Sequence, residues 1–328
     1  MKVLMLSHDK VKELLPMAEC IPLMAEALIS LATGNSHQPL RMIFRPPEAL
    51  GLMSLMPAFR SEAYPVFGLK AICVFPGNPV RGKDAHQGTV MLFSSETGEP
   101  MAIENASAIT AIRTAAVSAV AIDLLAKKDA GKLALIGAGI QGRAHLEAIS
   151  CVRKITSVQV TDKMIERTRK FVEEMGPHYS FPVQAMDSVE AALEGADIVV
   201  TITNSSEPVL RHEWIVAGTH INAVGACVPS AREIDSRTMA SSKLFVDSRE
   251  SALREAGDYL IALKEGVIGP DHIQAEIGEV LIGAKPGRES GKEITLFKSL
   301  GLAVEDLAAA EYVYRKALER NQGMWVEF

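Results

Sequence analysis

The chain has 328 residues, 48% of them hydrophobic and 23% charged, a balance that is typical of a globular protein with room for two domains. A formal net charge of −6 argues against a general electrostatic surface for nucleic acid or for an anionic membrane. The four cysteines form no Cys-x-x-Cys pair, which predicts a reduced cytoplasmic protein without a metal site. A local basic pocket for a small acidic substrate is compatible with this composition.

The first hundred residues combine helix and strand patterns. Residues 10–32 have the apolar spacing of a helix, which we expect Pro16 and Pro22 to interrupt. Residues 68–78 are predicted to form a buried strand that ends at a Pro-Gly-Asn turn, and residues 90–105 a hairpin around a polar turn. This region is therefore expected to be an α+β domain.

An Ala-rich helix is predicted from residue 106 to about residue 127. Because it contains Arg113 and Asp123, we expect a buried or amphipathic helix rather than a membrane span. Beyond it, short β-branched runs alternate with helical stretches, and the expected strands are residues 133–137, 157–162, 182–186, 197–203, 220–226 and 243–248. This alternation predicts an α/β fold with a Rossmann-type, doubly wound and mainly parallel sheet. An amphipathic helix is expected at residues 304–318.

Residues 137–142 read Gly-Ala-Gly-Ile-Gln-Gly and lie directly after a predicted strand, at the start of a predicted helix. The glycines of such a loop allow a tight turn, close approach of the backbone to a pyrophosphate, and close packing of the helix on the strand. The helix N-terminus adds free N–H groups and a partial positive charge. This register predicts a dinucleotide site that includes Gly137, Gly139, Ile140, Gln141 and Gly142.

Asp162 lies twenty residues past Gly142, at the end of the next predicted strand, where a carboxylate binds the ribose 2′-hydroxyl of NAD. NAD is therefore the expected cofactor. Lys163 and Arg167 follow closely and would receive the 2′-phosphate of NADP if the carboxylate turned away, so NADP is the alternative.

Three cationic residues, Arg41, Lys70 and Arg113, stand in otherwise apolar segments. One such residue is often a snorkelling or salt-bridged side chain, but three are harder to dismiss because a buried charge needs a partner. Arginine binds carboxylates through two parallel hydrogen bonds. Positive neighbours lower the pKa of a lysine toward the range of a proton donor or base. The sequence therefore predicts a site for a small carboxylate-bearing substrate.

Seven segments together carry a resemblance to the ornithine cyclodeaminase/μ-crystallin family along nearly the whole chain. They are LMPAF (55–59), GLKAICVFPGN (68–78), ITAIRTAAVSAVA (109–121), LIGAGIQGRAH (135–145), HINAVGA (220–226), AEIGEVLIGAKPGR (275–288) and LFKSLGLAVEDLAAA (296–310). The resemblance implies a homodimer. It also implies a substrate-binding and dimerisation domain at 1–113 with 305–328, and a Rossmann dinucleotide-binding domain at 114–304.

The resemblance also assigns expected roles to individual residues. Positions matching Arg41, Lys70 and Arg113 hold the substrate carboxylate in the family. Positions that touch the dinucleotide there match Thr89, Gly139, Gln141, Asp162, Thr203 and Ser299.

Cys227 departs from part of the family pattern. Cyclodeaminases and the alanine dehydrogenases of the family carry an aspartate at this position, which handles the amino group and water. A thiol is a poor substitute, since it is mostly neutral at pH 7. The crystallin-like branch, with its ketimine and 1-pyrroline-2-carboxylate reductases, also lacks that aspartate. Cys227 is thus a candidate catalytic residue, and a small buried filler is its alternative role.

Reduction of a preformed cyclic imine needs a hydride, a carboxylate clamp and a proton for nitrogen, but no carboxylate that activates water. The expected activity is therefore an NAD(P)H-dependent imine reductase. Ornithine cyclodeaminase, an alanine-type amino-acid dehydrogenase and a non-catalytic crystallin-like binding protein are the alternatives. The expected partner is a small amino or imino acid.

Overall fold

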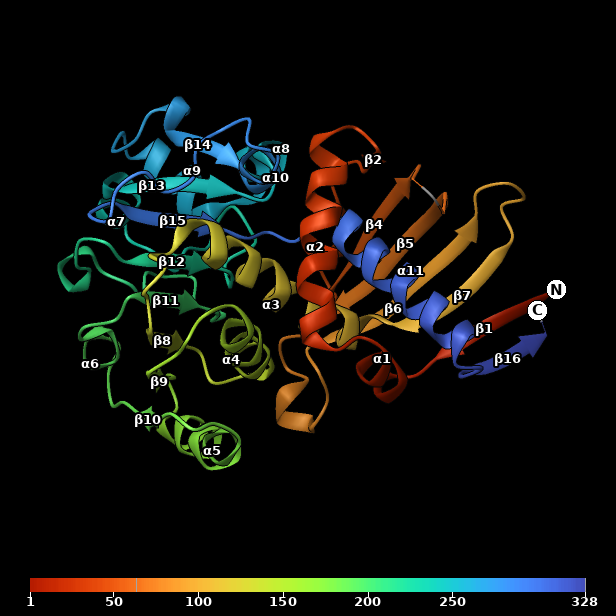
Figure 1. Ribbon diagram of the computed structural model, residues 1–328, viewed down its shortest axis with the longest axis horizontal. Helices are drawn as coiled ribbons and strands as arrows, with labels where there is room; N and C mark the ends of the chain where they lie inside the picture. The colour runs from red at the N-terminus through yellow and green to blue at the C-terminus, as the bar shows by residue number, and fades with distance from the viewer. Residues whose placement is uncertain (63, 328) are drawn as a thin grey trace. The chain divides into compact units, whose positions relative to one another are not determined.

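The computed structural model describes residues 1–62 and 64–327 (Figure 1). Its backbone contacts divide the chain into two compact units. Unit 1 consists of Met1–Thr114 and Gly301–Phe328, and unit 2 of Ala115–Leu300. The domain boundaries expected from the sequence, between residues 113 and 114 and between residues 304 and 305, differ from these by one and by four residues. The first change of unit occurs within one continuous helix, α3 (Ala106–Leu125).

Unit 1 is built on an eight-stranded sheet with the order β16-β1-β7-β6-β5-β4-β2, in which β3 also pairs with β4. Its strands are β1 (Lys2–Leu6), β2 (Ser36–His37), β3 (Met42–Phe44), β4 (Leu52–Arg60), β5 (Val66–Val74), β6 (His86–Ser94), β7 (Pro100–Asn105) and β16 (Met324–Glu327). Only the β1–β7 pair is parallel among the described strands of this sheet. Strands from both ends of the chain therefore complete one sheet.

Helices α2 (Met17–Ala32) and α11 (Ala303–Glu319) pack against each other and on one face of this sheet, and α1 (His8–Leu14) precedes them (Figure 1). The predicted break at Pro16 is confirmed, since Pro16 is the N-cap of α2. The predicted break at Pro22 is wrong, because α2 continues through it. Proline removes one helical hydrogen bond, and the buried apolar face of α2 outweighs that loss.

Unit 2 has a second eight-stranded sheet with the order β10-β9-β8-β11-β12-β15-β13-β14, and every described pair in it is parallel. Its strands are β8 (Lys132–Ile136), β9 (Ser157–Thr161), β10 (Val183–Ala185), β11 (Ile198–Thr201), β12 (His220–Ala223), β13 (Ser242–Val246), β14 (Ile273–Glu276) and β15 (Ile294–Lys298). The predicted Rossmann-type sheet is confirmed, including all six predicted strands. Strands β14 and β15 were not predicted from the sequence.

The helices that accompany this sheet are α4 (Ile140–Val152), α5 (Ile165–Met175), α6 (Val189–Leu193), α7 (Ser236–Ser241), α8 (Arg249–Glu255), α9 (Gly257–Lys264) and α10 (Ile277–Leu281). Two apolar clusters of buried side chains form the core of unit 2. Helix α3 is long and apolar enough to cross a membrane by length and composition, but 72% of its most apolar window is buried, as in a core helix.

Candidate active site

The strand order of unit 2 reverses at β8, which has β9 on one side and β11 on the other. In doubly wound sheets a dinucleotide binds outside the carboxyl ends of the strands at such a reversal. The loops that follow β8 and β11 begin at Gly137 and Ile202. The predicted glycine loop therefore lies at the position where this fold binds cofactors.

The glycine loop has the backbone geometry that a pyrophosphate site needs. Gly137 has a φ of +121°, which side chains disfavour, and a Cβ at Gly142 would lie 2.5 Å from the carbonyl oxygen of Gly137. A Cβ at Gly139 would meet nothing within 4 Å, so the loop is open there. Gly139 is the N-cap of α4, and among the described residues no side-chain capping hydrogen bond is formed at this helix start. Ile140, the first residue of α4, is exposed. These residues fit a bound dinucleotide phosphate.

Asp162 connects the end of β9 to the glycine loop. Its Oδ2 accepts a hydrogen bond from the N–H of Ala138 at 3.0 Å, and its Oδ1 accepts one from the N–H of Met164 at 3.1 Å. The predicted ribose-binding carboxylate therefore also fixes the loop that precedes α4. Lys163 and Arg167 are exposed beside it.

We expect Asp162→Ala to shift the ratio of NADPH to NADH affinity toward NADPH by about tenfold, because it removes a negative charge next to the 2′-phosphate position. Both cofactors lose affinity through the weakened loop, so the ratio isolates the effect of charge. Dissociation constants from nucleotide fluorescence measure it, with the exposed Asp187→Ala as a matched control. An unchanged ratio would show that Asp162 does not select the cofactor.

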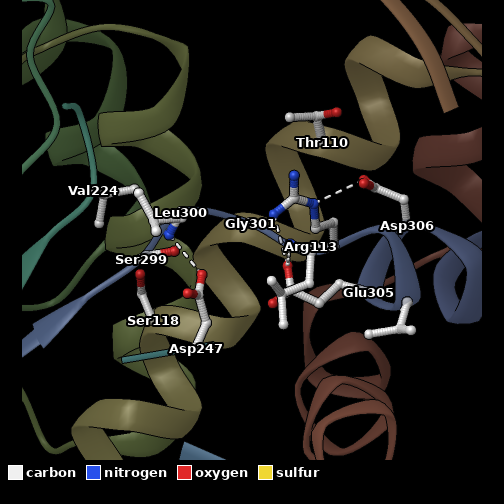
Figure 2. Close-up of polar contacts among 12 residues, drawn as sticks. Thr110, Arg113, Ser118, Val224, Asp247, Ser299, Leu300, Gly301, Glu305 and Asp306 are labelled. Carbon is white, nitrogen blue, oxygen red and sulfur yellow. Dashed lines mark hydrogen bonds and ion pairs between the residues drawn. The ribbon is translucent and has the colours of Figure 1, made fainter. Parts of the chain in front are cut away.

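Two further predicted cofactor residues lie at the carboxyl edge of the same sheet. Thr203 follows β11, and both its N–H and its Oγ1 donate to Glu233 Oε1, at 2.6 and 2.8 Å. Ser299 follows β15, is buried, and donates its N–H to the carbonyl oxygen of Ala223 at 3.0 Å. Figure 2 shows Ser299 beside Leu300, whose N–H donates to Asp247 at 2.5 Å.

In unit 1, Lys70 and Arg113 share one buried carboxylate. Asp306, in the first turn of α11, lies 2.6 Å from Lys70 Nζ through Oδ2 and 2.9 Å from Arg113 Nε through Oδ1. Arg113 Nη1 also lies 2.8 Å from Glu305 Oε2 (Figure 2). All four side chains are at most 5% exposed. We call Lys70, Arg113, Glu305 and Asp306 the buried ion cluster.

Arg41 is held next to this cluster by the chain segment that enters α11. Its Nη2 donates to the carbonyl oxygen of Gly301 at 2.7 Å. Gly301 has a φ of +78°, and a Cβ there would lie 2.6 Å from Arg113 Nη1. The structure therefore brings together the three predicted cations. Thr89 pairs with Ala71, so strand alternation places its side chain on the sheet face opposite to Lys70.

The environment of the buried ion cluster lowers the pKa of Lys70 to about 8. Burial is the main cause, the charge of Asp306 opposes it, and the charges of Arg113 and Arg41 reinforce it. Burial acts to raise the pKa of Asp306, but the charges of Arg113 and Lys70 hold it below its ordinary value. Lys70 therefore exchanges its proton close to neutral pH while Asp306 stays ionised, which suits Lys70 for acid–base chemistry.

The family model of the ornithine cyclodeaminase/mu-crystallin family matches residues 1–321. The chain belongs to this family. A Delta(1)-pyrroline-2-carboxylate reductase of Bacillus cereus is 37% identical over 99% of this chain and 100% of its own.

Two solved members of the ornithine cyclodeaminase/mu-crystallin family have nearly the same fold. The Delta(1)-pyrroline-2-carboxylate reductase of Thermococcus litoralis, in complex with NADH and L-proline, matches with a TM-score of 0.96 and 39% identity over 98% of this chain and 99% of its own. An archaeal alanine dehydrogenase dimer with bound NAD matches with a TM-score of 0.93 and 35% identity over the full length of both chains.

Cys227 is packed against the apolar core of unit 2. Its Sγ lies 3.4 Å from the carbonyl oxygen of Val224 and 3.9 Å from that of Ser299, and its side chain contacts a cluster of buried apolar residues. These contacts are typical of a small filler.

We expect Cys227→Ala to keep kcat/KM within about tenfold, since the alanine leaves most of the packing in place. Steady-state kinetics measure the effect, and Cys151→Ala, at an exposed cysteine on α4, is the matched control. A fall beyond about a hundredfold, or about 2.7 kcal/mol, would assign the thiol a chemical role.

Sequence reasoning missed the anionic half of the site. Glu305 and Asp306 lie in the segment LAVEDLAAA, where an acidic pair at the start of an otherwise apolar helix was an available signal. It also missed His86 at the start of β6, whose pKa is lowered by burial and by the charges of Lys70 and Arg113. The buried Glu233 of unit 2 was a third omission.

Proposed function

We propose that this protein is an NAD(P)H-dependent oxidoreductase that reduces the C=N bond of a small, carboxylate-bearing cyclic imine, such as 1-pyrroline-2-carboxylate, to an amino acid. The observation that carries the proposal is the buried Lys70 ammonium, paired with Asp306 beside Arg113, with Arg41 anchored next to them. The relative that binds NADH and L-proline supports the substrate class, since proline is the product of such a reduction.

Each residue of the substrate site has a defined task in this proposal. Arg41 and Arg113 bind the substrate carboxylate, for which a guanidinium offers paired N–H donors. Lys70 holds a proton that passes to the imine nitrogen, and Asp306 orients the ammonium group. The glycine loop, Asp162, Thr203 and Ser299 would hold the cofactor. When bound, the reduced nicotinamide supplies the hydride.

The alternatives differ in what the site must do to water or to a primary amine. Ornithine cyclodeamination is disfavoured because this chain has Cys227 at the position where, according to the family resemblance, cyclodeaminases carry the aspartate that handles the amino group and water. Alanine dehydrogenation has the support of the archaeal relative and is disfavoured by the same cysteine. A purely binding role is disfavoured because the buried Lys70 ammonium, held by Asp306 at 2.6 Å beside Arg113, is placed to deliver a proton.

We also propose that the protein is a cytoplasmic homodimer. The sheet face of unit 1 that lies opposite α11 is apolar and includes exposed side chains on three strands, namely Met42, Phe44, Met53 and Phe67. Exposed apolar patches of this kind mark interfaces between proteins. The four cysteines are free, which agrees with a reducing compartment.

A nucleotide oxidation panel tests the proposed function. NADH and NADPH are each mixed with five- and six-membered cyclic imino acids, with pyruvate plus ammonia, and with no second substrate, and NAD is mixed with ornithine and with alanine. Absorbance at the nicotinamide band is followed in every reaction, and ammonia and proline are assayed in the ornithine reaction. The proposal expects rapid oxidation with a cyclic imino acid. Ammonia and proline formed from ornithine without net NADH would favour the cyclodeaminase, and reversible oxidation of alanine would favour the dehydrogenase. NADH binding with no turnover of any substrate would favour a binding protein.

A further inference from the structure

One buried carboxylate joins the ends of two neighbouring strands in unit 2. Glu233 Oε1 accepts from the N–H and the Oγ1 of Thr203, at 2.6 and 2.8 Å. Its Oε2 accepts from the Oγ1 of Thr201 at 3.0 Å and from the N–H of Gly225 at 2.6 Å. Glu233 is 0% exposed. Four donors, taken from the ends of β11 and β12, thus converge on a single side chain.

The two loops come so close around this carboxylate that no side chain fits at Gly225. A Cβ there would lie 2.1 Å from the carbonyl oxygen of Thr203 and 2.5 Å from Glu233 Oε1. Charge-assisted hydrogen bonds of this kind are strong and directional. Glu233 therefore ties the loops after β11 and β12 to each other.

Glu233 is itself fixed by a buried ion pair. Asp258 Oδ1 accepts from the N–H groups of Glu233 and Ile234, at 2.7 and 3.0 Å. Asp258 Oδ2 lies 3.0 Å from Lys298 Nζ, and both side chains are 0% exposed. Lys298 Nζ also donates to the carbonyl oxygen of Ala223 at 3.2 Å. A continuous network thus runs from β15 through Asp258 to Glu233.

The location of this network indicates which part of the cofactor it serves. A dinucleotide lies across the point of strand reversal, with one nucleotide over each half of the sheet. The β8–β9–β10 half carries the glycine loop and Asp162, the residue suited to the adenosine ribose. The β11–β12–β15 half, which Glu233 organises, is left for the nicotinamide nucleotide.

We propose that Glu233 is a positioning residue that holds the loops after β11 and β12 in the arrangement required by the nicotinamide ring of the cofactor. The inference rests on the nicotinamide cofactor of the proposed function, but not on the identity of the imine. Binding of nucleotides in the absence of a second substrate therefore tests it separately from the activity panel.

The test compares Glu233→Gln with the unmodified protein by titration with NADH and with ADP-ribose, which lacks the nicotinamide ring. In the variant, an amide nitrogen replaces one carboxylate oxygen and faces a buried N–H of Thr203 or Gly225, so the loops must separate. The expected result is a loss of NADH affinity of about tenfold or more, with ADP-ribose affinity unchanged within about twofold. The control is Glu213→Gln, whose side chain is 55% exposed.

Thr201→Val keeps the test decisive if Glu233→Gln does not fold. Thr201 is 0% exposed, so its hydroxyl acts on the cofactor only through Glu233. The expected loss of NADH affinity is about two- to fivefold, again with ADP-ribose unchanged. A parallel loss of NADH and ADP-ribose affinity would show a merely structural role, and unchanged NADH affinity in the folded variants would show that Glu233 does not position the nicotinamide ring. Either outcome overturns the proposal.

Discussion

Replacement of Lys70 by methionine is expected to lower kcat/KM for the imine by about a thousandfold while the affinity for NADH stays within about twofold. The change removes a general acid, a contribution of about 10²–10⁴. Methionine retains an apolar chain in the space beneath α11, and Asp306 keeps Arg113 as its partner at 2.9 Å. Because Asp306 keeps this ion pair, we expect the variant to fold and to bind NADH, so the loss of kcat/KM reports the missing acid.

The pH dependence of kcat/KM is a second test of the role of Lys70 in the same variant. Lys70 has a pKa of about 8, so in the unmodified protein the rate of reduction falls as the pH rises through this value and the ammonium loses its proton. The alkaline fall should be absent from the residual activity of Lys70→Met. Lys83→Met, at an exposed lysine of unit 1, is the matched control. A variant that kept more than about a tenth of the activity would contradict the role of Lys70 as proton donor.

Replacement of Asp306 by asparagine should damage both stability and acid–base behaviour. Removal of one partner of a buried ion pair costs about 3–5 kcal/mol, because the remaining charge has left water without compensation. Lys70 relieves part of this cost by giving up its proton, and Arg113 keeps Glu305 at 2.8 Å. We therefore expect the free energy of unfolding to fall by about 3 kcal/mol, measured by urea denaturation.

The expected pH shift of Asp306→Asn follows from the sign of the lost charge. The Asp306 carboxylate raises the pKa of Lys70 against the effect of burial, so its removal lowers that pKa below about 8. The alkaline fall in kcat/KM should accordingly begin at lower pH than in the unmodified protein. The control is Asp9→Asn, whose carboxylate is 96% exposed. Unchanged stability together with an unchanged profile would refute the role of the buried ion cluster.

The Rossmann unit was predictable because its signals are local. The glycine spacing at 137–142, the strand before it and Asp162 after it all lie within one βαβ unit, and the structure confirms this unit. β15 was missed because Thr295 and Lys298 break its apolar run, although both are 0% exposed. Their burial depends on partners such as Asp258, which sequence pattern cannot provide.

The cations of the substrate site were predictable, whereas their counter-charges were not. A lone arginine or lysine in an apolar segment is conspicuous. Acidic residues in the first turn of an amphipathic helix, in contrast, are typical of an exposed helix start. The charges of Glu305 and Asp306 are compensated in the buried site by Arg113 and Lys70. The burial of Glu233 was equally unpredictable, because in the sequence it is a single acidic residue in a polar loop.

The return of α11 to the sheet of unit 1 has a consequence for synthesis on the ribosome. Arg113 and Asp306 are 193 positions apart, with all of unit 2 between them. At about 5–20 residues per second, Arg113 leaves the peptidyl-transferase centre on the order of 10–40 s before its counter-ion is made. During that interval Lys70 and Arg113 stay hydrated, since burial without Asp306 is costly. We therefore expect the nascent N-terminal segment to stay open and the substrate site to close only after the cofactor-binding unit has been translated.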